Sequence, residues 1–356
     1  MKKILIPIFG LLFLILLTPF ILAKLSNSNI DKKIIELKKN GVFIKEINSD
    51  IGYLNSKRVF EVKFDKNTKN FNNFINQADF IVTLTFKNLP ITKANFDIKV
   101  KNVNILNKNI LKGLEAHIVT KDFKTLNYKI QNYKNLIELD DVYGIYKRGK
   151  YDKLVINSKK ISILKFLSMQ NLTFNVVINN LELGLIDYYW KSKKWKIGYN
   201  DIVLKGENSE ENVTTHLYPN QKYKFEDIFL SDKIGIKLQS NYIAFANVDW
   251  KLIANNFSKD NFQNSEFNVS LLWSDTEYQK ALVGGGELKG NILLLSKIPK
   301  KLEDIKANIS LGFDKDLFER ITKDFDPKEI NKYFKNNKTH IEIENGEIKA
   351  NGNRIQ

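Results

Sequence analysis

Cysteine is absent from the 356 residues, and histidine occurs only as His117, His216 and His340. The absence of cysteine excludes disulfides, thiolate-bound metal centres and a cysteine nucleophile. So few histidines leave little material for metal binding or general acid–base catalysis. Neither a Gly-x-Ser-x-Gly elbow nor a His-Glu-x-x-His zinc helix occurs. The sequence therefore predicts a protein that is not an enzyme and holds no cofactor or metal.

Arginine is also scarce, although the chain is strongly basic. The formal net charge is +16, yet only four of the 56 basic residues are arginine. Proteins that read nucleic acids favour arginine, because its planar guanidinium binds phosphate and guanine through two hydrogen bonds at once. The lysines are spread along the chain and form no dense basic arm. We therefore expect no nucleic-acid partner, whereas a diffuse positive surface would attract anionic lipid headgroups.

Charge is missing from one long segment near the N-terminus. Met1-Lys2-Lys3 precedes Ile4 to Ala23, a run of 20 residues without a charged side chain. As a helix this run would be about 30 Å long, which matches the hydrocarbon thickness of a bilayer. It is longer than the apolar region of most cleaved signal peptides, so an uncleaved signal anchor is favoured over a cleaved one. We expect residues 1–23 to form a transmembrane helix.

The orientation of this segment has two interpretations. The run is followed by Lys24, Lys32, Lys33, Lys38 and Lys39, and positive charge normally stays on the cytoplasmic side. Large domains nevertheless cross the membrane largely regardless of charge. A basic and then apolar N-terminus ahead of a cysteine-free body is typical of export. We expect a single-pass inner-membrane protein whose body lies in the periplasm.

The period of the apolar residues changes after Gly41. Residues 24–41 are amphipathic and predict a stalk helix that ends at Asn40-Gly41. Further on, Phe96, Ile98 and Val100 alternate with polar residues, as do the apolar residues of 174–178 and 195–199. Strict alternation indicates antiparallel sheets with one buried and one wet face. Because no linker interrupts the pattern, we expect residues 42–356 to form one elongated, β-rich extracytoplasmic body.

Helical signals gather near the C-terminus. Leu317, Phe318 and Ile321 keep helical spacing. Asp326-Pro327-Lys328-Glu329 is typical of an N-cap followed by a proline at the first helical position. Asn345-Gly346 then predicts a tight hairpin turn, since both residues tolerate positive φ. The expected fold is mainly β, with short helices near the C-terminus.

Adjacent acidic residues and glycosylation sequons are the remaining candidate sites. Asp140-Asp141 and Glu210-Glu211 are interpreted as solvated loop charges, because neighbours on a strand point to opposite faces and form no catalytic pair. Asn212 and Asn268 lie in Asn-x-Ser/Thr sequons with an acidic residue two positions earlier, which resembles the acceptor of bacterial N-glycosylation. Asn212 ranks first because the polar run 207–220 predicts an exposed loop, whereas Asn268 precedes the apolar residues of an expected strand. The three histidines are expected to be surface or hydrogen-bonded residues.

Three stretches follow one another in a characteristic order. They are residues 52–60, residues 302–311 with the expected helix at Leu317-Phe318, and residues 345–352. They resemble the early Tyr…Arg strand pair, the strand that runs into a late helix, and the terminal Asn-Gly…Asn-Gly hairpin of the YdgA-type family, bacterial envelope proteins of unknown function. The resemblance implies an inner-membrane anchor and a periplasmic β-rich body. It implies no catalytic residues.

Three functions stay open at this point. A tethered β body without catalytic motifs predicts a non-enzymatic envelope protein that binds a partner protein, a second copy or the membrane surface. A long sheet that curls could instead enclose a lipid or another apolar ligand, and the 12% aromatic residues would line such a groove. The third function, an envelope-polymer hydrolase, requires a cleft that holds two carboxylates or a histidine with a strongly shifted pKa.

Overall fold

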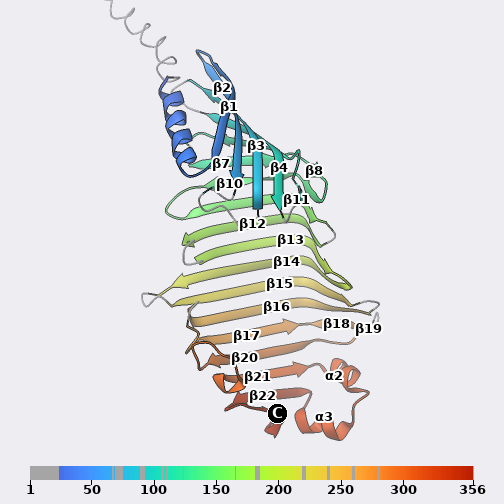
Figure 1. The fold of residues 1–356 in the computed structure, drawn as a ribbon. Helices are drawn as coiled ribbons and strands as arrows, with labels where there is room; N and C mark the ends of the chain where they lie inside the picture. The colour runs from blue at the N-terminus through green and yellow to red at the C-terminus, as the bar shows by residue number, and fades with distance from the viewer. Residues whose placement is uncertain are drawn as a thin grey trace, which may run out of the picture. The chain divides into compact units, whose positions relative to one another are not determined.

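The fold is mainly antiparallel β-sheet in the computed structural model of the chain, and this part of the sequence prediction is confirmed (Figure 1). The structure describes residues 24–65, 68, 75–88, 93–105, 108–109, 111–122, 124–164, 166–180, 185–218, 222–238, 241–258, 261–278 and 281–355. They form two units, one up to residue 164 and one from residue 165. The prediction that residues 42–356 form one elongated body and not separate domains stays a prediction, and limited proteolysis would test it.

No helix among the described residues is both long enough and apolar enough to cross a membrane. The expected span, residues 4–23, lies outside them. The helix expected after it is present, and its described part covers residues 24–39; we call it the N-terminal helix. It ends as predicted, because Gly41 adopts a φ of 84° and donates its N–H to the carbonyl of Lys38 at 3.0 Å.

The first unit is a sheet against which the N-terminal helix packs. Its strands pair in the order β1-β2-β3-β4-β6-β7-β10-β11. The C-terminal half of β11 pairs with β9. The short strand β5 pairs with the end of β4, and β8 pairs with β9. The strands are β1 (Phe43–Ile51), β2 (Asn55–Asp65), β3 (Ile75–Lys87), β4 (Ala94–Ile105), β5 (Lys108–Asn109), β6 (Glu115–Thr120), β7 (Thr125–Ile130), β8 (Tyr133–Lys134), β9 (Ile137–Asp140), β10 (Val142–Lys147) and β11 (Asp152–Ile163).

The second unit is an open meander of long strands, each hydrogen-bonded to the next. Its strands are β12 (Leu167–Asn180), β13 (Leu185–Tyr199), β14 (Ile202–Leu217), β15 (Tyr223–Leu238), β16 (Asn241–Phe257), β17 (Glu266–Trp273), β18 (Asp275–Tyr278), β19 (Ala281–Leu282), β20 (Gly286–Leu294), β21 (Ile305–Phe313), β22 (Lys338–Glu344), β23 (Glu347–Ala350) and β24 (Asn353–Arg354). A short 3₁₀ turn (Leu302–Asp304) precedes β21. The predicted hairpin joins β22 to β23 across Asn345-Gly346, which is confirmed.

The two short helices expected near the C-terminus are present as α2 (Lys315–Thr322) and α3 (Pro327–Tyr333). Asp326 caps α3 as predicted, since its carboxylate accepts the N–H of Lys328 at 2.9 Å. Both helices pack on the end of β21. The ring of Phe313 there lies 6.5 Å from that of Phe318 and 6.4 Å from that of Phe334.

The long strands of the second unit have one apolar face. Cross-strand partners on this face include Trp190, opposite Phe174 on β12, and Trp250, which lies between Phe229 and Leu271. The opposite face carries cross-strand ion pairs such as Lys191–Glu210 at 3.0 Å. The sheet therefore separates apolar and charged residues as the alternation predicts.

The alternation changes phase along one row of the second sheet, which we call the break row: Asn171, Lys193, Asn208, Asp232 and Asn247. The pairing between neighbouring strands skips this row and resumes in the same register. The three asparagines adopt the left-handed conformation, with φ between 46° and 50°. Because neighbouring strands break in the same row, the register is preserved.

The indole of Trp195 shows that the apolar face continues across the break row. Its ring lies directly on Gly206, where a Cβ atom would clash with it, and its Nε1 donates to Oγ of Ser209 at 2.7 Å. Gly206 and Ser209 therefore share a face although three positions separate them. Strict alternation would have placed them on opposite faces.

Candidate functional site: an apolar cavity beneath the N-terminal helix

The N-terminal helix covers the largest cluster of buried apolar residues in the described first unit. Ile30 and Ile34, four positions apart on one helix face, pack against it. The cluster consists of Val42, Ile44, Phe60, Leu84, Phe86 and Ala94. These residues come from β1 to β4 and from the residue just before β1. The helix and the sheet thus share one small core.

A cavity of about 660 Å³ lies between the helix and strands β2 to β4. Its floor is formed by apolar side chains of the sheet, among them Phe60, Leu84 and Phe96. Ile30 and Ile34 line its helical side. Lys33 is the charged residue among the described lining residues, and Ser26 and Asn29 are its polar neighbours. This arrangement, an apolar chamber with a few polar groups on one wall, is typical of a small-molecule site.

Arg58 holds the helix in place over this cavity. Its Nη2 lies 2.7 Å from a carboxylate oxygen of Asp31 on the helix and 2.8 Å from one of Glu46 on β1, and its Nε donates to Glu46 at 2.9 Å. The Arg58 side chain is only 7% exposed. Its guanidinium also lies 5.1 Å from the ring centroid of Phe60, one of the floor residues. One side chain therefore ties the helix, two strands and the cavity floor together.

The electrostatics of this clamp follow from its hydrogen bonds. The hydrogen bond from Arg58 lowers the pKa of Glu46, and the charge of Arg58 adds to this effect. The bond to Glu46 also raises the pKa of Arg58, so both groups stay charged at neutral pH. Proteins tolerate a buried guanidinium when, as here, it has carboxylate partners and hydrogen bonds that replace water.

A second cluster of interest lies on the apolar face of the second unit. Glu211 on β14 accepts hydrogen bonds from Tyr188 Oη at 3.2 Å and from Trp190 Nε1. Asp227 on β15 accepts one from Trp250 Nε1 at 3.2 Å. Burial raises the pKa of Asp227, and the neighbouring Glu211 carboxyl raises it further. Burial also raises the pKa of Tyr188 to about 12, with Glu211 contributing.

The two carboxyl groups lie on neighbouring strands and on the same face of the sheet. Oδ1 of Asp227 is buried and has no hydrogen-bond donor among the described residues. The Glu211 carboxyl is close enough to Asp227 to raise the pKa of Asp227 through its charge and through hydrogen bonding. The hydrolase hypothesis stays a prediction.

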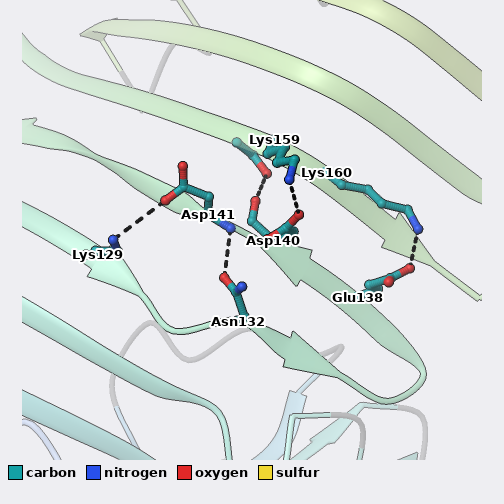
Figure 2. A network of polar contacts seen from close by, with 8 residues as sticks. Lys129, Asn132, Glu138, Asp140, Asp141, Lys159 and Lys160 are labelled. Carbon is teal, nitrogen blue, oxygen red and sulfur yellow. Dashed lines mark hydrogen bonds and ion pairs between the residues drawn. The ribbon is translucent and has the colours of Figure 1, made fainter.

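The adjacent acidic pair Asp140-Asp141 lies where β9 passes into β10, and Figure 2 shows its surroundings. Lys129 lies 3.6 Å from the Asp141 carboxylate, and Lys159 lies 3.7 Å from that of Asp140 (Figure 2). Asp141 is a left-handed residue with a φ of 49°, and its N–H donates to Asn132 at 3.0 Å. The two acids therefore have separate lysine partners, and their interpretation as non-catalytic charges stays a prediction.

The loop prediction for Glu210-Glu211 is wrong, because both residues lie inside β14. Glu210 points to the charged face and pairs with Lys191, whereas Glu211 lies among the aromatic rings. The loop prediction for Asn212 fails for the same reason. Asn212 is exposed but lies opposite Tyr189 on one side and Ile228 on the other. The run of polar residues reflects a strand whose alternation is interrupted at Asn208.

Asn268 lies in β17, as expected, and its side chain is engaged. Its Oδ1 accepts a hydrogen bond from Asn291 Nδ2 at 3.0 Å, and Asn291 also donates to Glu266 at 2.6 Å. Both sequons thus lie in paired strands. A glycan at Asn212 or Asn268 stays a prediction, and the pairing implies that a transferase would act before the strands associate.

The histidines lie at the surface of the described structure. His117 Nδ1 lies 2.7 Å from Asp97 Oδ1, and His340 Nε2 lies 3.5 Å from Glu342. The ring of His216 packs edge-on against Tyr218. Among the described residues, no group of three histidine or acidic side chains could hold a metal ion.

Sequence analysis missed Arg58 and the cavity beneath the helix. A signal for Arg58 was present, since it is one of four arginines in a lysine-rich chain and alternates in phase with Phe60 and Val62. A charged residue in phase with the apolar face of a strand indicates a buried ion pair. The cavity itself has no such signal, because its volume depends on how closely the helix approaches the sheet.

Comparisons with known proteins add no family. No family model, no curated protein and no solved structure matches the chain. The resemblance to the YdgA-type family stays a prediction.

Proposed function

We propose that this chain is a non-enzymatic, membrane-anchored envelope protein that holds an elongated apolar ligand beneath its N-terminal helix. The cavity of about 660 Å³ supports this proposal. Its volume falls within the roughly 300–1,000 Å³ of typical small-molecule sites. Sequence analysis placed a lipid groove on a curled long sheet; the proposed site lies instead between the helix and β2 to β4.

The cavity lining suggests the class of ligand. Phenylalanine, leucine, isoleucine and valine side chains dominate it, so an acyl chain or another flexible hydrocarbon would be favoured over a polar molecule. Lys33 places a positive charge on the helical wall. A ligand with an anionic head and an apolar tail would use both features.

The anchor predicted at residues 4–23 would place this site close to a membrane. The described part of the N-terminal helix follows the apolar run directly in the sequence. A periplasmic body on such an anchor would hold the cavity close to the source of acyl chains. Exchange of a lipid-derived ligand between membrane and cavity would need no catalytic residues.

A fluorescent long-chain fatty acid tests the proposal. Ile34→Trp fills the cavity from the helical side, and Ile35→Trp on the same helix is the matched control, since Ile35 is 55% exposed and does not line the cavity. We expect saturable binding by the full chain, a loss of at least tenfold in affinity for Ile34→Trp, and no change for Ile35→Trp. Equal binding by both variants, or none by the parent chain, would overturn the proposal.

A charge reversal tests the role of the polar wall. Lys33→Glu should weaken binding of the fatty acid probe but not of a neutral ester of the same chain length. Lys32→Glu, one position away and outside the cavity lining, is the control. Weakening of both probes by both variants would show that net charge, and not the site, is responsible.

A further inference from the structure

The tip of the β1–β2 hairpin exposes large apolar side chains. Ile51, Tyr53 and Leu54 are 56%, 46% and 50% exposed. Exposed apolar residues at a tight turn, where polar residues are usual, indicate an interaction surface. We call these three residues the apolar tip.

The apolar tip is held rigidly by a buried asparagine. Asn88 is fully buried, and its Nδ2 donates to the carbonyls of Gly52 at 2.8 Å and Tyr53 at 3.2 Å. Its backbone N–H donates to the carbonyl of Leu54 at 2.8 Å. Three consecutive carbonyls of the turn are thus fixed from below. The side chains of the tip are presented outward by a preorganised backbone and not by a loose loop.

The apolar tip lies beside the beginning of the described N-terminal helix. A hollow lies between the helix and the hairpin, and its lining residues are Lys24, Asn27, Ser28 and Asp31 of the helix and Ile51, Gly52 and Tyr53 of the hairpin. The Arg58 clamp to Asp31 fixes the helix against the same hairpin. The position of the tip relative to Lys24 is therefore set by the fold.

The sequence before Lys24 indicates that the apolar tip lies near a membrane. Residues 4–23 carry no charge and are long enough to span a bilayer. If they do, Lys24 emerges at the membrane surface, and so does everything held against it. Tyrosine is enriched at that depth because its ring is apolar and its hydroxyl is polar.

We propose that the apolar tip inserts into the headgroup region of the bilayer that holds the N-terminal segment. The tip would be a second membrane contact that fixes the tilt of the first unit on its anchor. Lys24 and the exposed Lys57 flank it and favour anionic headgroups. The acidic residues nearby are Asp50, opposite Lys57 in the hairpin, and Asp31, which is paired with Arg58. The inference rests on the predicted span and is independent of a ligand in the cavity.

Depth-dependent quenching tests the insertion, and the absence of native cysteine makes single-site labelling clean. The full chain is reconstituted in vesicles of phosphatidylethanolamine and phosphatidylglycerol, with an environment-sensitive fluorophore on Leu54→Cys. The control is Leu164→Cys, a leucine of the same unit that is 60% exposed. It follows β11, which is six strand spacings from β2, or about 29 Å measured along the sheet.

We expect a blue shift at residue 54 and several-fold stronger quenching there than at residue 164 by lipids with a nitroxide near the headgroup. Nitroxides deep in the acyl chains should quench residue 54 less. Equal quenching at both positions in vesicle-bound protein would overturn the inference, and so would a chain that fails to float with vesicles. A blue shift without nitroxide quenching would mean that another protein copy covers the tip, and would equally overturn it.

Discussion

Removing the Arg58 side chain should release the N-terminal helix from the sheet. In Arg58→Ala the contacts to Asp31 at 2.7 Å and to Glu46 at 2.8 and 2.9 Å are lost together. These contacts join the helix to β1 and β2 across the side of the cavity. We expect the helix to open locally while the long strands of the second unit keep their stability.

The size of the effect follows from the exposure of the partners. Breaking a buried ion pair costs about 3–5 kcal/mol when the remaining charge stays buried. The Asp31 and Glu46 side chains are 55% and 36% exposed, so both carboxylates regain water once Arg58 is gone. The cost should therefore fall to about 2 kcal/mol, which corresponds to a roughly 30-fold larger equilibrium constant for opening at 1.4 kcal/mol per tenfold change.

Hydrogen exchange read by mass spectrometry measures this opening directly. Amides of residues 24–39 should lose about 30-fold in protection in Arg58→Ala, whereas peptides from β14 and β15 serve as an internal reference. Arg58→Lys should fall in between, because it keeps the charge but not the planar fork. Arg148→Ala is the matched control, since Arg148 is an exposed arginine of the same unit. Unchanged protection in Arg58→Ala would refute the clamp.

The clamp also predicts a pH dependence. The hydrogen bond from Arg58 places the folded-state pKa of Glu46 below its ordinary value of 4.5. The contribution of ionised Glu46 to stability is therefore complete above pH 4.5 and is lost as the pH falls through the folded-state pKa. Protection of the helix should decrease on acidification below about pH 4.5 in the parent chain. This decrease should be smaller in Arg58→Ala.

Two further substitutions test the second unit, each by urea denaturation. Gly206→Ala should destabilise it by about 1–3 kcal/mol because the new Cβ meets the Trp195 indole, and Trp195→Leu in the same chain should recover part of the loss; no loss would show that the indole does not rest there. For Asp227→Asn we expect higher stability at pH 7, since the folded-state pKa of Asp227 is raised and its charged form is the destabilised one. The gain in stability should vanish below pH 3.8, the ordinary pKa of an aspartate. The exposed control Asp249→Asn should show no gain. An equal gain for Asp227→Asn at pH 7 and below pH 3.8 would contradict the raised pKa.

Local signals predicted the class of fold well. Alternation near residues 96–100 and 174–178, the Asp326-Pro327 cap and the Asn345-Gly346 turn each depend on a few neighbouring residues, and each is present in the structure. Period and capping are properties of short segments, so they can be read without knowing what the segment packs against.

The candidate site could not be predicted in the same way. The cavity depends on a helix and strands up to about 70 positions apart in the sequence. The contact between Glu211 and Asp227 arises from the register of β14 and β15, and sequence neighbours such as Glu210 and Glu211 gave no hint of it. Contacts between distant segments follow from register and docking distance, which no single segment encodes.

Because of the break row, the rule for which residues of a long strand face the apolar side differs before and after the break. In β14, residues 202–207 and 209–217 alternate half a period out of step with each other. Averaged over the whole strand, the apolar signal of one segment cancels that of the other. If Asn208 adopted an ordinary extended conformation in place of its left-handed one, both segments would stay intact but one of them would turn over, so that its charged side chains would meet the indoles of its neighbours. A single asparagine thus keeps the two halves of the strand facing the same way.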